Sequence, residues 1–172
     1  GRRECSTARV VGDRGERGVR VKVLVSGGTS LLARTTAEAL LGRGDEVVLL
    51  QRGTSVVDAP QVRGDVRDPE VVRRAMQGCD AVVHAAAKVG IVGAWEDFRS
   101  INVDGTANVI GTARELGVSR VVYVSTPSVS HAGRSLIGAG ADPAVTGRAH
   151  AHYAESKAIA EGNVQAINYF VA

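Results

Sequence analysis

The sequence is poor in cysteine, in aromatic residues and in long apolar runs, and each shortage excludes a class of protein. Its 172 residues include two cysteines and four histidines. They lack the spacing of metal ligands or of a disulfide framework, so we predict neither. Aromatic residues make up 3% of the chain, which disfavours stacking on nucleic-acid bases. No apolar run reaches the roughly 18 residues of a transmembrane helix, and no secretory signal is visible. We therefore expect a cytoplasmic protein with no membrane segment.

The excess of positive charge lies at the start of the chain. Residues 1–20 hold six arginines against three acidic side chains, which accounts for the whole net charge of +3. This segment is rich in Arg and Gly and has no periodicity, so we interpret it as a disordered basic extension or a misassigned start. A nucleic-acid-binding arm is the alternative, which the shortage of aromatic residues disfavours. We expect no nucleic-acid partner.

From residue 21 onward, short apolar runs alternate with longer amphipathic ones. Continuous β-branched runs predict buried strands at 21–26, 46–50, 61–65, 81–87 and 120–126. The amphipathic stretches predict helices at 31–44, 68–78, 95–116 and 153–167. This alternation predicts a doubly wound α/β domain over residues 21–172, with a parallel sheet covered by helices on both faces. The last residues, INYFVA, either begin a sixth strand or leave the edge of the fifth unpaired.

The segment SGGTSLLA, residues 26–33, follows the first predicted strand and is similar to a phosphate-binding turn. In such a turn three glycines allow a tight bend, a close approach of phosphate, and packing of helix on strand. Gly27 fills the first position, whereas Ser30 and Ala33 stand at the second and third. A serine adds bulk near the anion, but its hydroxyl can donate to phosphate. Taken alone, the segment is either a degenerate cradle or an ordinary strand-to-helix corner.

Five further motifs follow in order along the chain: GDVRD (64–68), HAAAKVG (84–90), INVDGTANV (101–109), VYVSTPSV (122–129) and YAESKAIAE (153–161). Together with the turn, they resemble the extended short-chain dehydrogenase/reductase superfamily. The resemblance is to its NAD(P)-dependent epimerase/dehydratase and 3β-hydroxysteroid dehydrogenase-like branch, and it covers residues 21–166. It implies an NAD(P)-binding Rossmann fold. Members of the superfamily are much longer, so we expect this chain to lack most of a C-terminal substrate domain.

The resemblance also implies which residues hold the cofactor. The backbone of the turn would bind phosphate, Asp65 would touch adenine, and Asn102 would brace the site. The full set expected at the cofactor is Gly27, Thr29, Ser30, Leu31, Leu32, Arg52, Asp65, Val66, Ala85, Ala86, Ala87, Asn102, Ser125, Tyr153 and Lys157. A homodimer formed through the helices at 95–116 and 153–167 is a further expectation from the family.

The end of the second strand bears on the choice between NAD and NADP. An acidic residue at this point normally holds the ribose 2′-hydroxyl of NAD. Here Gln51 takes that place and Arg52 follows. A guanidinium can pair with the 2′-phosphate of NADP, so we predict NADP as the preferred cofactor and NAD as the second. The alternative for Arg52 is a solvated charge at a strand end.

Tyr153 and Lys157 are four residues apart on one predicted helix, so both project from the same face. A free tyrosine, with a pKa of about 10, is a poor base, and a neighbouring ammonium favours its phenolate. Tyr153 can then take a proton from a substrate hydroxyl, or return it in the opposite direction. By resemblance, Thr126 supplies the third catalytic group. His84 is expected to be a satisfied residue at a strand end, and His131 either faces substrate or lies on a surface loop.

These residues predict an NAD(P)-dependent oxidoreductase or epimerase. Its small-molecule substrate would be a secondary alcohol or ketone of the hydroxysteroid or nucleotide-sugar class. The alternative is a non-catalytic NAD(P)-binding sensor or scaffold, or an inactive fragment of such an enzyme. Retention of Tyr153, Lys157 and Thr126 favours the enzyme, because a sensor needs none of them. Ser30 and the length of the chain favour the alternative.

Overall fold

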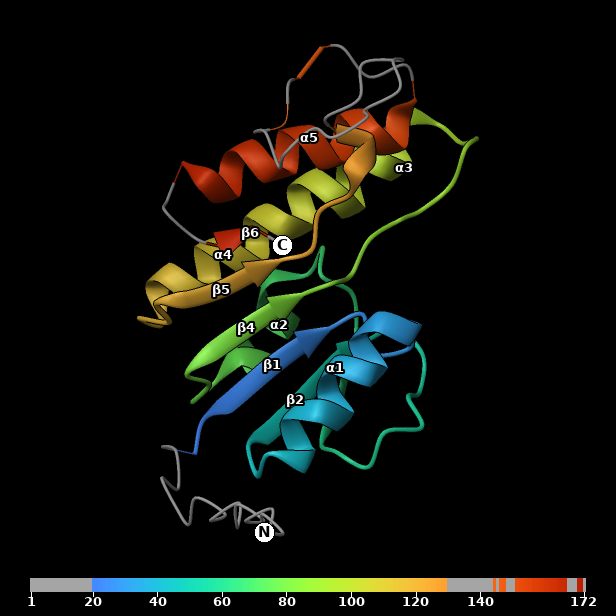
Figure 1. Ribbon diagram of the computed structural model, residues 1–172. Helices are drawn as coiled ribbons and strands as arrows, with labels where there is room; N and C mark the ends of the chain where they lie inside the picture. Colours follow the sequence, from blue (N-terminus) through green and yellow to red (C-terminus); the bar gives the residue numbers. More distant parts are fainter. Residues whose placement is uncertain (1–19, 130–143, 145, 148–150, 167–169, 172) are drawn as a thin grey trace, which may run out of the picture.

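The computed structural model describes residues 20–129, 144, 146–147, 151–166 and 170–171. Within these residues six strands form one parallel sheet in the order β3-β2-β1-β4-β5-β6 (Figure 1). The strands are β1 (Lys22–Ser26), β2 (Glu46–Gln51), β3 (Gln61–Arg63), β4 (Ala81–His84), β5 (Arg120–Tyr123) and β6 (Phe170–Val171). This is the strand order of a Rossmann sheet. The predicted doubly wound α/β fold is confirmed.

The helices follow the strands in the predicted alternation. They are α1 (Leu31–Gly42), α2 (Pro69–Met76), α3 (Trp95–Phe98), a π-helical turn η1 (Arg99–Asp104), α4 (Gly105–Glu115), a 3-10 turn η2 (Pro127–Val129) and α5 (His152–Gln165). Asp68 caps α2 by accepting from the backbone N–H groups of Glu70 at 3.0 Å and Val71 at 3.3 Å, and Pro69 opens the helix. None of the helices in the described residues has the length and apolar character needed to cross a membrane.

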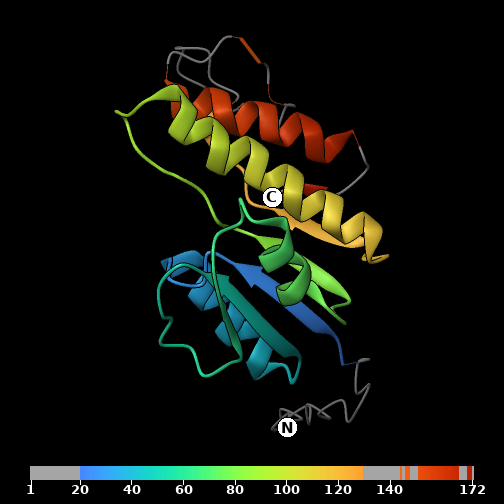
Figure 2. The ribbon, with the colours of Figure 1, turned by 180° about the vertical axis from the view of Figure 1, so that it is seen from behind.

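Helices cover both faces of the sheet, as a parallel sheet requires. On one face α1 packs through Ala33 and Ala37 against Val23, Val25 and Leu49. On the opposite face, seen in Figure 2, lie α2, α4 and α5. Their buried side chains form a second cluster with the other side of the strands: Leu24, Leu50, Val72, Met76, Val82, Val109, Val121 and Val164. The alternation of the strand residues between these two clusters accounts for the continuous apolar runs in the sequence.

Three strands end earlier than predicted. The runs 61–65, 81–87 and 120–126 were expected to be strands throughout, whereas β3 ends at Arg63, β4 at His84 and β5 at Tyr123. The register accounts for β4 and β5, because Ser26, His84 and Tyr123 are aligned at the last pairing of the three central strands. The residues after β4, Ala85 to Ala87, leave the sheet and line a pocket at its carboxyl edge.

The end of the described chain settles one open alternative. Phe170 and Val171 pair with Val122 and Tyr123, so β6 is a sixth strand and covers the edge of β5. A second difference concerns the helix predicted at 95–116. It is present as α3, η1 and α4 in succession, and the π-helical turn in its middle was not predicted. That turn has one buried residue, Asn102.

Candidate functional site

The turn between β1 and α1 is shaped by two glycines. Gly27 has φ +79°, and a Cβ placed on it would lie 2.9 Å from the backbone nitrogen of Ala86. A Cβ on Gly28 would lie 2.5 Å from Oε1 of Gln51. Neither position has room for a side chain, which leaves backbone open toward the crevice. The second requirement, at Gly28, was not identified from the sequence, because it depends on a neighbouring strand.

Ser30, the residue in place of the second glycine, is the N-cap of α1. Its Oγ accepts a hydrogen bond from the backbone N–H of Ala33 at 3.3 Å, and its own N–H donates to Gly27 O at 2.8 Å. Since the hydroxyl accepts in the cap, its proton remains available to a ligand. Serine at this position therefore caps the N-terminus of α1, and its side chain is turned to the helix by the bond to Ala33.

A pocket of about 270 Å³ opens at the carboxyl ends of β1, β2 and β4. Nine residues expected at the cofactor line it: Gly27, Thr29, Ser30, Arg52, Asp65, Val66, Ala85, Ala86 and Ala87. The wall also includes five residues outside the expected set: Leu50, Gln51, Gly53, Gly64 and Ile101. Leu50 and Gln51 could have been found from their place at the end of β2, whereas Ile101 reaches the pocket from the π-helical turn, which no sequence signal indicated.

Gln51 brings an unpaired acceptor to this wall. Its Nε2 donates to Oε1 of Gln61 at 2.7 Å, while its own Oε1 is buried without a hydrogen-bond partner among the described residues. The side chain is 5% exposed. Arg52, next in the chain, is exposed at the rim. The end of β2 thus offers a neutral acceptor and a cation, with no carboxylate.

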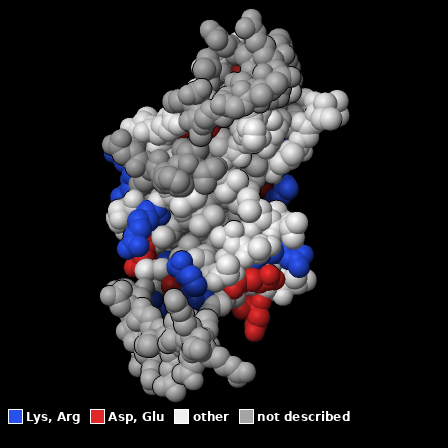
Figure 3. Space-filling model, viewed as in Figure 1, with Lys and Arg blue, Asp and Glu red and all other residues white. Residues whose placement is uncertain are grey.

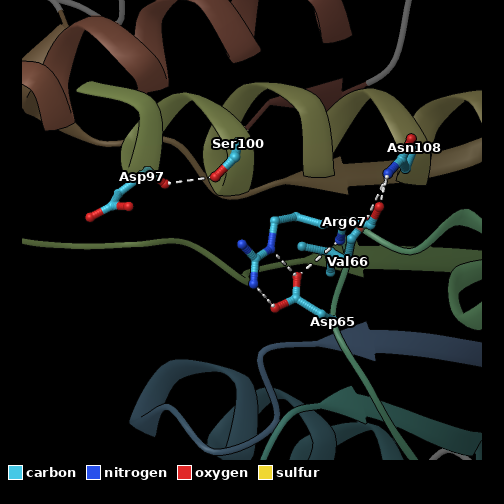
Figure 4. A network of polar contacts seen from close by, with 6 residues as sticks. All are labelled: Asp65, Val66, Arg67, Asp97, Ser100 and Asn108. Carbon is cyan, nitrogen blue, oxygen red and sulfur yellow. Dashed lines mark hydrogen bonds and ion pairs between the residues drawn. The ribbon is translucent and has the colours of Figure 1, made fainter. Parts of the chain in front are cut away.

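Asp65 is already engaged by a neighbour (Figure 4). Arg67 donates to its two carboxylate oxygens, from Nε at 3.0 Å and from Nη2 at 2.8 Å. These bonds lower the pKa of the Asp65 carboxyl, burial opposes the effect, and the charge of Arg52 adds to it. Asn108 of α4 holds the next residues by donating to Val66 O and Arg67 O, each at 3.0 Å. Asp65 is therefore ionised and fixed in orientation at the pocket wall.

The remaining residues expected at the cofactor lie outside the pocket wall. Leu31 and Leu32 begin α1 with exposed side chains. Ser125 donates its hydroxyl to Oε2 of Glu161, which is 4% exposed and also accepts from the backbone N–H of Ala144 at 3.2 Å. Glu161 belongs to the YAESKAIAE motif and was given no role from the sequence. The cofactor roles of Leu31, Leu32 and Ser125 stay predictions, as do those of the nine expected residues that line the pocket.

Lys157 is buried beneath the end of β5. Its Nζ donates to Val124 O at 2.6 Å and lies 4.0 Å from the centroid of the Tyr123 ring. Burial lowers the pKa of this ammonium to about 7, and the carboxylate of Glu161 partly offsets the effect. A lysine held in this way is a charge that changes near neutral pH.

Tyr153 is half-buried on the same helix, one turn before Lys157. Thr126 donates its hydroxyl to Ser128 Oγ at 3.3 Å and accepts from the backbone N–H of Ser128 at 3.4 Å. Across the part of the chain that is described, no hydrogen bond joins the side chains of Tyr153, Lys157 and Thr126 to one another. Their convergence on a substrate stays a prediction.

Asn102 ties the crevice to the helix that carries Tyr153. Its Oδ1 accepts from Lys88 N at 2.7 Å, and its Nδ2 donates to Lys88 O at 3.0 Å and to Ser156 Oγ at 2.9 Å. The side chain is 1% exposed. The bracing expected of Asn102 is present, between the segment after β4 and α5, and the residue does not line the pocket.

Two of the four histidines, His84 and His152, belong to the described residues and lie in different settings. His84 is fully buried and bonded at both ring nitrogens, and burial, with the charge of Lys157 adding to it, lowers its pKa to about 3. The expectation of a satisfied residue is confirmed. His152 is exposed, with Nδ1 3.0 Å from Gly93 O and its ring against Trp95. His131 lies outside the described residues.

The segment between β4 and α3 carries three strongly exposed apolar side chains. Val89, Ile91 and Val92 are 72%, 93% and 85% exposed. On the face drawn in Figure 3, basic and acidic side chains are intermixed and lie toward the margins, around an uncharged middle. That face of the described residues does not present an extended surface of one charge sign.

A parallel Rossmann sheet with a glycine turn and a pocket at its carboxyl edge defines a dinucleotide-binding α/β protein. The chain belongs to the NAD dependent epimerase/dehydratase family, whose model matches residues 23–169. This is a family of NAD-dependent enzymes, and the resemblance inferred from the motifs is confirmed.

Named relatives in sequence include reductases and dehydrogenases. A 2-alkyl-3-oxoalkanoate reductase of Stenotrophomonas maltophilia is 42% identical over 154 residues, covering 86% of this chain and 47% of that protein. A 3 beta-hydroxysteroid dehydrogenase/Delta 5-->4-isomerase of Mycobacterium tuberculosis is 32% identical over 158 residues, covering 86% of this chain and 43% of that protein. The chain therefore spans about half the length of these relatives.

Solved structures of epimerases share the fold. The UDP-glucose 4-epimerase of Thermus thermophilus, in complex with NAD, is 31% identical with a TM-score of 0.72, over 84% of this chain and 50% of that chain. The UDP-glucose 4-epimerase of Brucella ovis, also in complex with NAD, is 26% identical with a TM-score of 0.77, over 88% of this chain and 50% of that chain.

Proposed function

We propose that this chain binds NADP in preference to NAD and contributes the proton-transfer groups of a hydride-transfer reaction on a secondary alcohol or ketone. The observation that carries the proposal is the pocket at the carboxyl edge of the sheet, because nine of its lining residues are those expected to hold the cofactor. Helix α5, which carries Tyr153 and Lys157, follows the segment after β5 at the same edge.

The residues of the pocket fit a dinucleotide. The turn at Gly27 and Gly28 carries no side chain, because a Cβ there would meet Ala86 or Gln51, so only backbone borders the pocket at Gly27. Helix α1 begins directly after the turn, at Leu31, and a helix N-terminus favours an anion such as phosphate. Asp65, fixed by Arg67, offers carboxylate oxygens on the side where adenine would lie. The buried and unpaired Oε1 of Gln51 is an acceptor at the position that normally meets the ribose.

The bound nicotinamide would supply or accept the hydride, and the proton would be moved by this chain. In oxidation Tyr153 takes the proton from the substrate hydroxyl, and in reduction it returns that proton to the carbonyl oxygen. Lys157 acts one turn away on α5 as an ammonium that favours the phenolate of Tyr153. The hydroxyl of Thr126 would steady the substrate oxygen, since within the described residues its partner is the neighbouring Ser128.

The substrate class is proposed from two observations. The relatives named above include a reductase of oxoalkanoates and a steroid dehydrogenase. The compounds in both names are largely apolar molecules that carry a carbonyl or a hydroxyl group. Val89, Ile91 and Val92 expose apolar surface on the segment that leaves β4 beside the crevice. Both favour an apolar hydroxy or keto compound, such as a hydroxysteroid, over a nucleotide sugar.

Turnover tests the reaction. The purified chain is mixed with NADP and a panel of hydroxysteroids, hydroxyalkanoates and UDP-sugars, and the absorbance of reduced cofactor is followed. We expect activity on the apolar alcohols and a loss of at least about 100-fold in Tyr153→Phe, because the general base is removed. Tyr123→Phe, which removes another buried hydroxyl, is the matched control. Cofactor binding with no turnover, unchanged by Tyr153→Phe, would instead support the non-catalytic sensor.

Binding tests the choice of cofactor. Arg52 is exposed at the pocket rim, so Arg52→Ala should fold normally while it removes the cation available to a 2′-phosphate. We expect the Kd of NADP to rise about tenfold and that of NAD to change less than about twofold. Arg63→Ala, at the end of β3, is a control with the same change of charge. Equal weakening of both cofactors in Arg52→Ala would contradict the preference.

A further inference from the structure

A buried hydrogen-bonded chain begins at the cofactor turn. The backbone N–H of Ala86 donates to Ser26 Oγ at 3.2 Å, beside the close contact of Gly27 with the same backbone. Ser26 Oγ lies 2.6 Å from Nδ1 of His84, and Nε2 of His84 lies 3.0 Å from Oγ1 of Thr106. These hydrogen bonds therefore lead from β1 through β4 into α4.

The same chain continues to the helix that carries Tyr153. The hydroxyl of Thr106 donates to Asn102 O at 2.6 Å. Nδ2 of Asn102 donates to Ser156 Oγ at 2.9 Å, and the hydroxyl of Ser156 donates to Tyr153 O at 2.8 Å. Every side chain in the sequence Ser26, His84, Thr106, Asn102 and Ser156 is at most 1% exposed.

The proton positions along the chain follow from the donors and acceptors present. Thr106 gives its one proton to Asn102 O, so toward His84 it can only accept, and His84 must carry a proton on Nε2. Nδ1 of His84 is then bare and accepts from the hydroxyl of Ser26. Ser26 Oγ in turn accepts from Ala86 N–H. With His84 neutral and protonated on Nε2, each hydrogen bond in this series has one donor and one acceptor. A cationic His84 would carry a proton on Nδ1 as well, and the hydroxyl of Ser26 would then lose its acceptor.

We propose that His84 is a positioning residue that sets the cofactor turn and the backbone of Tyr153 in a fixed relation through this chain. The proposal deepens the function proposed above and rests on it. Five side chains from β1, β4, η1, α4 and α5 are joined without exposure to water, and at the turn Gly27 leaves no free space against Ala86. A displacement at one end is therefore passed to the other, because packed interiors yield little.

The tautomer of His84 is measured first, in the unmodified chain and without cofactor. Two-dimensional ¹⁵N NMR distinguishes a proton on Nε2 from one on Nδ1, and a pH titration follows its protonation. We expect the Nε2–H form, neutral down to about pH 5 or below. A proton on Nδ1, or a cationic His84 near pH 6.5, would overturn the proposal whether or not the chain binds NADP.

Transmission is measured in variants of α4. Thr106→Val removes the hydroxyl that links His84 to Asn102, Thr106→Ser restores it, and Thr112→Val makes the same change at a buried threonine of α4 outside the hydrogen-bonded chain. Without cofactor, we expect Thr106→Val to shift the backbone resonances of both Ala86 and Tyr153, and Thr112→Val to shift neither. Thr106→Ser should resemble the unmodified protein.

Cofactor binding gives the second readout. We expect Thr106→Val to raise the Kd of NADP about tenfold although Thr106 does not line the pocket, while Thr112→Val stays within about twofold. Equal effects of Thr106→Val and Thr112→Val, on resonances or on Kd, would overturn the proposal. If the unmodified chain binds no NADP, the proposed function fails and the resonance shifts alone decide the role of His84. If Thr106→Val does not fold, the tautomer of the unmodified chain decides it.

Discussion

Lys157 places an ionisable amine where water scarcely reaches. Its side chain is 3% exposed, and burial lowers its pKa to about 7, against a smaller opposing effect of Glu161. The same group has an ordinary pKa of 10.5. At pH values between about 7 and 10.5, the amine of Lys157 is protonated in the unfolded chain and neutral in the folded chain. The contribution of Lys157 to folding stability therefore rises as the pH rises from about 7 to about 10.5.

The direction of this pH dependence can be measured by comparison with a variant that lacks Lys157. Between about pH 7 and about pH 9.5, the free energy of unfolding of the unmodified chain should rise by about 3 kcal/mol more than that of Lys157→Met. Urea unfolding at the two pH values gives both numbers. Lys88→Met, at a half-buried lysine beside the crevice, is the control and should keep the behaviour of the unmodified chain. The same pH dependence in Lys157→Met and the unmodified chain would be evidence against a lowered pKa of the Lys157 amine in the folded chain.

Gly28 illustrates a requirement that only a neighbouring strand explains. Gly28→Ala would bring a methyl group to 2.5 Å from Oε1 of Gln51, so we expect a loss of about 1–3 kcal/mol of stability. Gly42→Ala, at a helical glycine with nothing within 4 Å, should be neutral or stabilising. Shortening the partner in Gln51→Ser should recover part of the loss. Thermal unfolding of the unmodified chain, Gly28→Ala, Gln51→Ser, the double variant and Gly42→Ala checks this. Additive effects of Gly28→Ala and Gln51→Ser would refute the contact.

At the scale of elements, Asp68 caps α2, the helix that follows one wall of the pocket. Asp68 satisfies two backbone N–H groups at the start of this helix, directly after the segment with Asp65 and Val66. Asp68→Ala should cost about 1 kcal/mol, and Asp68→Ser, which keeps a capping oxygen, should cost less. Urea unfolding measures both. Equal losses in the two variants would mean that the charge of Asp68, and not its cap, stabilises α2.

Regular elements were predictable because local patterns specify them. The cap at Asp68 and Pro69 and the β-branched strands follow from the chemistry of neighbouring residues. The π-helical turn at Arg99–Asp104 was not predicted, since the apolar spacing of residues 95–116 is compatible with an uninterrupted α-helix. Asn102 sits in this turn and bonds to Lys88 and Ser156, partners remote in sequence. Local pattern carries no information about such partners.

At the scale of the whole molecule, the order of strands and helices determined the fold, and the pocket appeared where the strand order reverses. Residues that follow strand ends, such as Asp65 and Ala86, could be placed at the pocket from the sequence. The burial of Lys157 against Val124 and the pairing of Ser125 with Glu161 could not, because both depend on how α5 docks on β5. The homodimer stays a prediction.

The width of the sheet separates the two groups of residues on which the proposed function depends. Gln51 ends β2 and Arg52 follows it, on one side of β1, whereas Tyr153 and Lys157 belong to α5, which packs beside β5 and β6 on the other. Within the described part of the chain, no hydrogen bond or ion pair joins one pair to the other. Under the proposed function, a substitution at Arg52 that alters cofactor preference therefore replaces no atom of the proton-transfer groups.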